Sequence, residues 1–213
     1  MLTLYGYWRS GTSYRTRIAL NIKGVAYTQL PVNLRAGEQR HAAFEQLNPQ
    51  RLVPALRLED AVLTQSPAIL EWLEECHPQP PLLPADPEGR AHVRAMAAAI
   101  GCDIHPLNNL RVLEALRTDF TATPDQEQRW IARWIGEGFT AVEAMIAQHG
   151  KGFAYGDRPT LADCYLVPQL YSAERFGVDC SAWPRLVAAA EAARALQPFA
   201  DAHPDNQPDA VRP

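Results

Sequence analysis

A run of hydroxyl side chains lies where a short apolar segment meets the first amphipathic segment of the chain. Ser10, Thr12 and Ser13 surround Gly11 here, and Arg9 precedes them. A helix N-terminus carries backbone N–H groups without intrahelical partners and a partial positive charge, so it can hold an anion such as a thiolate. Serine and threonine are also common N-caps, so the run is equally typical of simple helix capping.

Two further positions can bind a short peptide if the first eighty residues form one thioredoxin-like sheet. Val53 precedes Pro54, and a cis bond between them would turn the Val53 backbone outward to pair with an extended peptide. The sequence leaves this isomer open. Ser66 fits an N-cap and Pro67 the first helical position, and such an N-terminus can also bind a carboxylate. The three positions match the thiol, the middle and the α-carboxylate of glutathione.

The elements that must position these residues alternate between strand and helix patterns. Strand patterns run over residues 2–7, 26–33, 55–58 and 61–64, and helical patterns over 13–23, a polar stretch ending at Leu47, and 66–77. We therefore expect a βαβ unit followed by ββα, which is an α/β thioredoxin-like domain over residues 1–80.

The pattern changes at a proline-rich linker over residues 78–87. Helical patterns follow over residues 88–116, 124–149, 160–176 and 183–196, and the tail after Pro198 is expected to be irregular. We therefore expect an all-α domain over residues 88–213. Thr160 and Asp163 have the spacing of a capping box, so we expect them to stabilise a helix rather than to take part in chemistry.

Composition excludes several classes of function. The 213-residue chain has a formal charge of -4, which disfavours a nucleic-acid partner. No apolar run approaches the ~20 residues needed to span a bilayer, and no signal peptide is recognisable, so we expect a cytoplasmic protein without membrane association. The four cysteines form no CxxC pair, and HExxH, GxGxxG and Walker motifs are absent from the sequence. We expect no metal site.

Short motifs occur in a specific order along nearly the whole chain. They are Arg9-Ser10, Arg15-Thr16-Arg17-Ile18-Ala19-Leu20, Leu47-Asn48-Pro49, Val53-Pro54, Gln65-Ser66, Leu82-Leu83-Pro84, Leu161-Ala162-Asp163 and Ala173-Glu174-Arg175-Phe176. In these motifs the chain resembles the zeta-class glutathione transferases, which include the maleylacetoacetate and maleylpyruvate isomerases. The usual Ser-Ser-Cys signature of that class is replaced by Ser10-Gly11-Thr12, which is closer to the bacterial maleylpyruvate branch and makes disulfide chemistry less favoured.

The resemblance implies a homodimeric enzyme that isomerises a maleyl keto-acid, maleylpyruvate or maleylacetoacetate, to its fumaryl isomer in aromatic compound catabolism. Glutathione would be the cofactor, and its thiol would add to the double bond and leave after rotation. Ser10 is expected to contact the sulfur, with Thr12 as the second candidate. Two alternatives stay open: a general glutathione S-transferase or zeta-type dehalogenase, and a noncatalytic glutathione-transferase-like assembly module.

The resemblance also implies roles for individual residues. Arg9, Arg111 and Arg175 are expected to line one pocket for the dicarboxylate, because a guanidinium pairs with a carboxylate in bidentate fashion. His105 and Asn109 lie four apart on a helix that Pro106 should bend, so they are expected to share a face. The expected glutathione contacts are Ser10, Gly11, Thr12, Ser13, Arg15, Gln39, Val53, Gln65, Ser66, Asp103, His105, Asn109 and Arg111.

Overall fold

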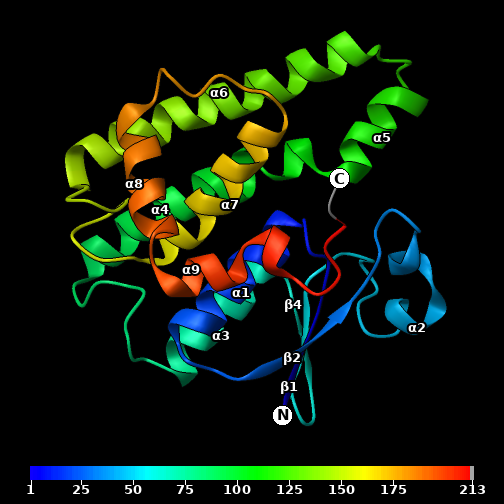
Figure 1. Ribbon diagram of the computed structural model, residues 1–213, viewed down its shortest axis with the longest axis horizontal. Helices are drawn as coiled ribbons and strands as arrows, with labels where there is room; N and C mark the ends of the chain where they lie inside the picture. Colours follow the sequence, from blue (N-terminus) through cyan, green and yellow to red (C-terminus); the bar gives the residue numbers. More distant parts are fainter. Residues whose placement is uncertain (212–213) are drawn as a thin grey trace. The chain divides into compact units, whose positions relative to one another are not determined.

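The computed structural model describes residues 1–211, and its contacts divide the chain into two compact units. The first unit is Met1–Leu82 together with residues 195–211, and the second is Leu83–Arg194 (Figure 1). This grouping differs from the proposed domains, 1–80 and 88–213, in the position of the last segment of the chain.

The first unit is built on a four-stranded sheet of order β2-β1-β3-β4. β1 (Leu2–Gly6) pairs in parallel with β2 (Tyr27–Pro31) and antiparallel with β3 (Ala55–Arg57), which pairs antiparallel with β4 (Val62–Thr64). The parallel pair requires a crossover, which α1 supplies, whereas β3 and β4 form a hairpin. The predicted βαβ and ββα order is therefore confirmed.

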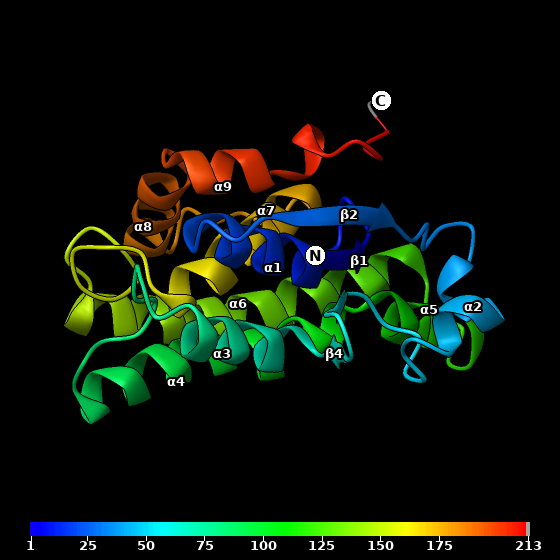
Figure 2. The same ribbon diagram turned by 90° about the horizontal axis from the view of Figure 1, so that it is seen from below.

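Two helices of the first unit pack against each other. α1 (Gly11–Ile22) ends at Lys23 followed by Gly24, whose φ of 64° is the left-handed conformation that favours glycine after a helix. α3 (Ser66–Cys76) contacts α1 and β4 (Figure 2). The side chains of Ile18 and Ile69 are completely buried. The polar helix expected up to Leu47 was largely wrong, because only the short η1 (Glu38–Arg40) and α2 (Ala42–Glu45) form there.

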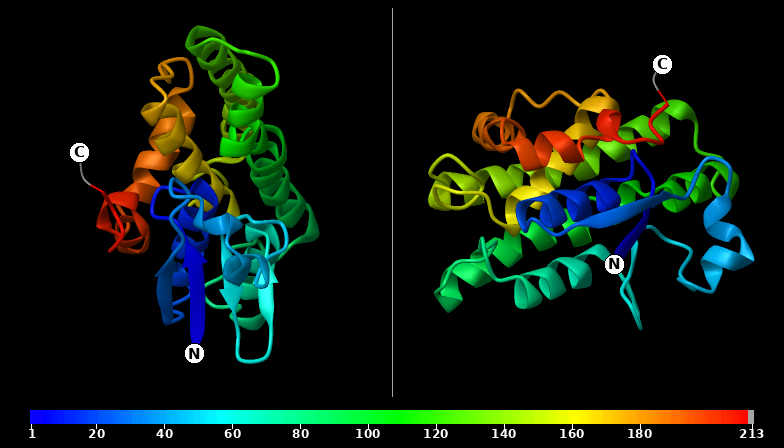
Figure 3. Two further views of the ribbon diagram at one scale, coloured as in Figure 1. Left: turned by 90° about the vertical axis from the view of Figure 1, so that its right-hand side faces the viewer. Right: turned by 60° about the horizontal axis from the view of Figure 1, so that its bottom comes forward.

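The tail after Pro198, which was expected to be irregular, is only partly so. Its first part belongs to α9 (Gln197–Ala202), which packs against α1, and to the 3-10 turn η3 (Pro204–Asn206) (Figures 1 and 3), whereas residues 207–211 form no helix or strand. Pro198 lies in the first turn of α9, where the missing N–H has no intrahelical partner to lose. Phe199 and Ala202 are buried, so this tail is part of the first unit's core.

The described part of the second unit is helical, as predicted. Its elements are α4 (Pro87–Asp103), η2 (Pro106–Asn108), α5 (Leu110–Thr118), α6 (Pro124–His149), α7 (Leu161–Arg175) and α8 (Pro184–Arg194). α4 packs against α6 and α7, and α8 packs against the same two helices. Gly138 of α6 permits a close approach, because a Cβ there would lie 2.3 Å from Ile104. Across residues 1–211, every helix is too short or too polar to cross a membrane.

The single helix expected over residues 88–116 is instead two helices. α4 ends at Asp103, and α5 begins at Leu110. Pro106 has no N–H for the helical ladder. His105 before it keeps helical backbone angles, and the chain leaves helical geometry at Asn109, whose ψ is 147°. Asn109 then starts a new helix, since its side chain accepts the backbone N–H of Arg111 at 3.2 Å. The chain is broken here rather than bent.

Candidate active site

The turn between β1 and α1 carries a chain of hydrogen-bonded hydroxyls. Ser10 is the N-cap of α1, and its Oγ accepts the Ser13 backbone N–H at 3.3 Å. The same Oγ lies 2.8 Å from Thr12 Oγ1, and the Thr12 hydroxyl donates to the Val53 carbonyl at 2.9 Å. The structure therefore brings together the first two of the positions predicted for glutathione.

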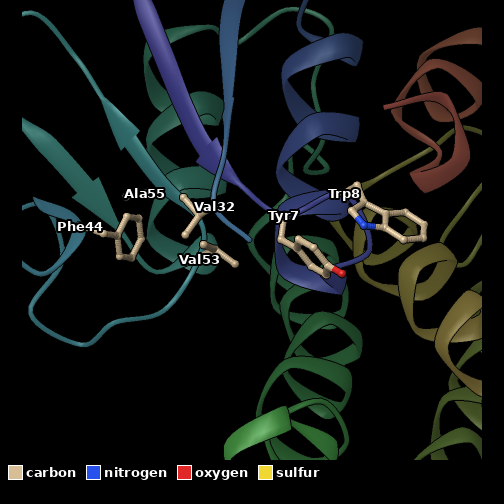
Figure 4. Packing of buried hydrophobic residues seen from close by; sticks show 6 residues of the cluster. All are labelled: Tyr7, Trp8, Val32, Phe44, Val53 and Ala55. Atoms are coloured by element: carbon tan, nitrogen blue, oxygen red, sulfur yellow. The ribbon is translucent and has the colours of Figure 1, made fainter. Parts of the chain in front are cut away.

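The peptide bond after Val53 and the packing of its side chain define the position of this residue. The Val53–Pro54 peptide bond is cis, which is the isomer that the sequence left open. The Val53 side chain belongs to a hydrophobic cluster, drawn in Figure 4, whose buried members are Tyr7, Trp8, Val32, Phe44, Val53 and Ala55. Within this cluster Figure 4 shows the Trp8 ring turned away from Phe44.

Ser13 differs from the other two hydroxyl residues of the turn. Its side chain is completely buried, and its Oγ accepts the backbone N–H of Tyr7 at 3.3 Å. Gly6 permits this arrangement, because a Cβ at Gly6 would lie 3.0 Å from Ser13 Oγ. The Ser13 hydroxyl is thus engaged within the fold, and Ser10 and Thr12 are the partly accessible hydroxyls of the turn.

The N-terminus of α3 differs from the prediction. Gln65, not Ser66, is the N-cap, and Ser66 is the first helical residue. Only one residue separates β4 from α3, so the chain must reverse at Gln65, which adopts a φ of 67°. The Gln65 amide donates to Gln50 Oε1 at 2.6 Å. Since Gln65 makes no side-chain cap to α3 within the described structure, the first N–H groups of α3 are open to an anion.

Arg15 and Gln39 are both buried in the first unit. Arg15 lies on α1 and is 2% exposed. Gln39 lies on η1, and its Oε1 is buried and has no hydrogen-bond partner among residues 1–211. A buried acceptor of this kind needs a donor, which an amide or ammonium group of a bound peptide supplies. Together with two helix N-termini open to anions, this acceptor fits glutathione, which has a thiol, amides and carboxylates.

The second unit contains the other predicted glutathione contacts. Asp103 is exposed at the end of α4, and His105 directly precedes η2. The helical face expected to join His105 and Asn109 was wrong, because the helix is broken between them and the Asn109 side chain caps α5. Arg111 is exposed in the first turn of α5.

The three arginines expected at the substrate occupy different units. Arg9 belongs to the first unit, and its guanidinium lies 5.1 Å from the centre of the Trp8 ring. Arg175 belongs to the second unit, is the last residue of α7, and lies 4.1 Å from the centre of the Phe176 ring. Arg111 also belongs to the second unit. The convergence of Arg9, Arg111 and Arg175 on one pocket stays a prediction.

The capping box at the start of α7 is confirmed. Asp163 accepts the backbone N–H of Thr160 at 2.8 Å, its hydroxyl at 3.0 Å and the N–H of Ala154 at 2.8 Å. Burial raises the pKa of this carboxyl to about 6, against the hydrogen bonds that lower it.

Two charged residues near the β1–α1 turn were missed by the sequence analysis. Arg17 is completely buried and donates to the Trp8 carbonyl at 2.9 Å, and Asp209 accepts the Trp8 N–H at 3.0 Å. The pattern of apolar residues in this helix does not predict that Arg17 is buried. Asp209 lies 201 positions from Trp8 along the chain, so spacing carries no information about this contact.

The first unit therefore has the features of a glutathione-binding thioredoxin-like domain. A hydroxyl stands at the N-terminus of the first helix, a cis-proline precedes the third strand, and an open helix N-terminus follows the fourth. An all-helical unit follows in the chain. This combination defines the class of the glutathione transferases.

Comparisons with known proteins agree with this class. The pattern of the glutathione S-transferase N-terminal domain matches residues 9–76, and that of the C-terminal domain matches residues 128–192. The chain is 54% identical over 212 residues to a maleylpyruvate isomerase of a Ralstonia species, covering 99% of this chain and 100% of that protein. The chain belongs to the glutathione S-transferase family, within the zeta class that includes the maleylpyruvate and maleylacetoacetate isomerases.

Two solved structures extend the comparison to three dimensions. A zeta-class maleylpyruvate isomerase, described as a holo structure, has a TM-score of 0.96 at 53% identity, covering 98% of this chain and 100% of that chain. A maleylacetoacetate isomerase from Anaeromyxobacter dehalogenans with GSH bound in its active site has a TM-score of 0.90 at 47% identity, covering 99% and 98%. The α/β thioredoxin-like plus all-α fold is therefore confirmed.

Proposed function

We propose that this protein is a glutathione-dependent cis–trans isomerase that converts maleylpyruvate or maleylacetoacetate to its fumaryl isomer in the breakdown of aromatic compounds. The observation that carries the proposal is the hydroxyl chain from Ser10 through Thr12 to the Val53 carbonyl at the N-terminus of α1. The names of the similar proteins support the choice of substrates. An assembly module would not need such a site.

The cofactor in this proposal is glutathione. When bound, it supplies a thiolate that adds reversibly to the substrate double bond and so permits rotation about it. The α1 N-terminus and Val53 hold its sulfur end and backbone, and the open N-terminus of α3 holds its α-carboxylate. The wider set of proposed contacts is Ser10, Gly11, Thr12, Ser13, Arg15, Gln39, Val53, Gln65, Ser66, Asp103, His105, Asn109 and Arg111.

Ser10 stabilises the anionic sulfur. Its hydroxyl is partly accessible and stands at the positive end of the α1 dipole. A hydrogen bond donated by Ser10 Oγ, together with the free N–H groups of the first turn, lowers the pKa of a thiol held there. Thr12 donates its own proton to the Val53 carbonyl and accepts from Ser10 until the Ser10 hydroxyl turns to a bound sulfur. Ser10 is therefore the sulfur contact and Thr12 the positioning group.

Arg9, Arg111 and Arg175 bind the two carboxylates of the substrate and offset the negative charge that develops on its keto oxygen during the reaction. Arginine suits this role because its guanidinium stays protonated and pairs with a carboxylate through two N–H groups. A conjugating transferase that acts on neutral electrophiles would not need three such cations. This is the basis for preferring the isomerase.

We also propose a cytoplasmic homodimer. The dimer is the usual assembly of the family that the chain resembles, and equilibrium sedimentation at several concentrations tests it. Within residues 1–211, the cysteines at positions 76, 102, 164 and 180 form no disulfide bond. Free thiols are typical of a reducing compartment, which supports the proposed location.

A limiting-glutathione experiment separates the isomerase from the conjugating enzyme. The protein receives a hundredfold excess of maleylpyruvate or maleylacetoacetate over glutathione, and the products are followed by NMR. An isomerase converts the whole substrate to the fumaryl isomer and leaves glutathione unchanged. A conjugating transferase stops once the glutathione has been consumed. A noncatalytic module converts nothing and is not retained on immobilised glutathione.

A further inference from the structure

The backbone of Trp8 is held on both sides by charged groups. Its N–H donates to Asp209 Oδ2 at 3.0 Å, and its carbonyl accepts from Arg17 Nη2 at 2.9 Å. The Trp8 side chain is only 6% exposed. Hydrogen bonds to charged groups are stronger than neutral ones, so these contacts define the position of this peptide unit.

Both charged groups are tied to the last segment of the chain. Arg17 Nε donates to the carbonyl of Ala202 at 3.0 Å. Gln207 donates from its amide to the carbonyls of Asp201 at 2.9 Å and His203 at 2.8 Å, and so fixes the chain that leads to Asp209. We call residues 207–210 the C-terminal strap.

The strap also reaches the sheet and its hydrophobic cluster. Asp209 Oδ1 accepts from the Gln29 side chain at 3.2 Å, so the two carboxylate oxygens join β2 to the β1–α1 turn. Ala210 packs against the cluster that contains Trp8 and Val53. Each oxygen of Asp209 is therefore used, and the strap is anchored by both polar and apolar contacts.

The peptide unit held in this way directly precedes the proposed chemistry. Arg9 lies over the Trp8 ring, and the Ser10 N–H donates to the Tyr7 carbonyl at 3.0 Å, which closes the turn around Trp8. A displacement of Trp8 therefore moves the Arg9 guanidinium and the Ser10 hydroxyl together. A shift of about 1 Å in catalytic groups is enough to lower a rate by up to about a hundredfold.

We propose that Asp209 is a positioning residue for the isomerisation, which acts through the Trp8 backbone to set Arg9 and Ser10. This inference rests on the proposed function. The C-terminal strap is then a functional part of the active site, although it lies at the opposite end of the sequence from Ser10.

Replacing Asp209 tests this role. Asp209→Ala removes the acceptor for Trp8, and we expect kcat to fall about tenfold or more while the KM for glutathione changes less than about threefold. Asp209→Asn keeps one oxygen for the Trp8 N–H, so it should retain most of kcat. Asp205→Ala is the matched control, since Asp205 is an exposed acid in the same tail and its carboxylate lies 3.8 Å from His203 Nδ1.

A second variant separates positioning from loss of folding. Gln207→Ala releases the strap without touching Trp8, so it should lower kcat in the same direction as Asp209→Ala. The double variant should be less than additive, because both changes act through one contact. A melting temperature that falls while kcat per folded molecule stays unchanged in Asp209→Ala would overturn the proposal.

A readout that does not depend on the isomerase reaction completes the test. The ultraviolet absorbance of the thiolate reports the pKa of the bound glutathione thiol, which Asp209→Ala should raise and Asp205→Ala should leave unchanged. If the wild-type protein binds glutathione without isomerising either keto-acid, the proposed function fails, yet this pKa shift still supports the strap. If the thiol pKa and kcat are both unchanged in Asp209→Ala, the strap proposal is wrong.

Discussion

Thr12 acts only as a hydrogen-bond acceptor toward Ser10, because the one proton of its hydroxyl is donated to the Val53 carbonyl. The two hydroxyl oxygens lie 2.8 Å apart, and the Thr12 to Val53 distance is 2.9 Å. In this arrangement the Ser10 proton points at Thr12. Ser10 can turn its proton toward a bound sulfur, whereas Thr12 would first have to break its bond to Val53.

This relationship predicts unequal effects for the two hydroxyls. Ser10→Gly should lower kcat about a hundredfold and raise the pKa of the bound glutathione thiol, whereas Thr12→Val should lower kcat only about tenfold. Glycine is preferred over alanine at position 10, because it costs only a few tenths of a kcal/mol as an N-cap. Steady-state kinetics with thiolate absorbance provides the comparison. A larger loss in Thr12→Val than in Ser10→Gly would mean that Thr12 is the sulfur contact.

The arginines provide the second prediction. Arg9→Ala and Arg175→Ala should each lower kcat/KM for the keto-acid by about a hundredfold, since each removes a charged hydrogen-bond donor to a carboxylate. The affinity for glutathione, measured by calorimetry, should change less than about threefold. Arg133→Ala is the control, because Arg133 is exposed on α6 and pairs with Glu137 four residues on. If Arg9→Ala and Arg175→Ala both keep the wild-type kcat/KM for the keto-acid, the proposed dicarboxylate pocket is contradicted.

A buried ion pair gives a prediction for stability. Lys23 Nζ lies 2.5 Å from Glu74 Oε2 and also donates to the Pro80 carbonyl, while Glu74 accepts the N–H of Leu82. Lys23→Met leaves the Glu74 carboxylate buried without its cation, so it should lower the free energy of unfolding by about 3–5 kcal/mol. The double variant Lys23→Met with Glu74→Leu should recover much of this loss. Urea unfolding measures both, and a loss below about 1 kcal/mol in the single variant would argue against the pair.

Asp163 makes stability depend on pH in a defined direction. Its pKa is raised from 3.8 to about 6, so between these values the folded state binds a proton that the unfolded state does not. The contribution of this group to stability is therefore lost as the pH rises through this window, by about 1 kcal/mol between pH 5 and pH 7.

Asp163→Asn isolates that contribution, because the amide does not titrate. Urea unfolding of both proteins at pH 5, 6 and 7 gives the difference in the free energy of unfolding between wild type and variant. We expect the free energy of unfolding of the wild type, relative to that of the variant, to decrease as the pH rises. If this relative free energy of unfolding stays constant or increases with pH, the pKa of the Asp163 carboxyl is not raised in the folded state.

Much of this structure follows from the sequence because local patterns determine it. The apolar alternation of β1, the spacing of the β3–β4 hairpin and Gly24 after α1 are each local signals, and each element formed close to its expected bounds. The Thr160–Asp163 capping box was readable for the same reason. The residue types also indicated that Ser10, Thr12 or Ser13 caps the first helix, and in the structure the cap is Ser10.

The sequence-based predictions failed where a local pattern fits two structures, or where no local pattern encodes the structure. Pro198 indicates a break in the chain, but it stands in the first turn of α9, where proline is tolerated. The turn between β4 and α3 requires a positive φ at Gln65. Residues other than glycine rarely adopt this conformation, so the sequence gives no sign of it. The contact between Asp209 and Trp8 joins the two ends of the sequence, and no periodicity encodes it.

The most direct test of the central claim is the ultraviolet absorbance of maleylpyruvate and, separately, of maleylacetoacetate in the presence of this protein, with and without glutathione. We predict that the absorbance of at least one keto-acid falls rapidly only when glutathione is present, that the product is the fumaryl isomer, and that Ser10→Gly loses most of the rate. Failure of the folded, glutathione-binding protein to convert either compound would contradict the assignment as an isomerase.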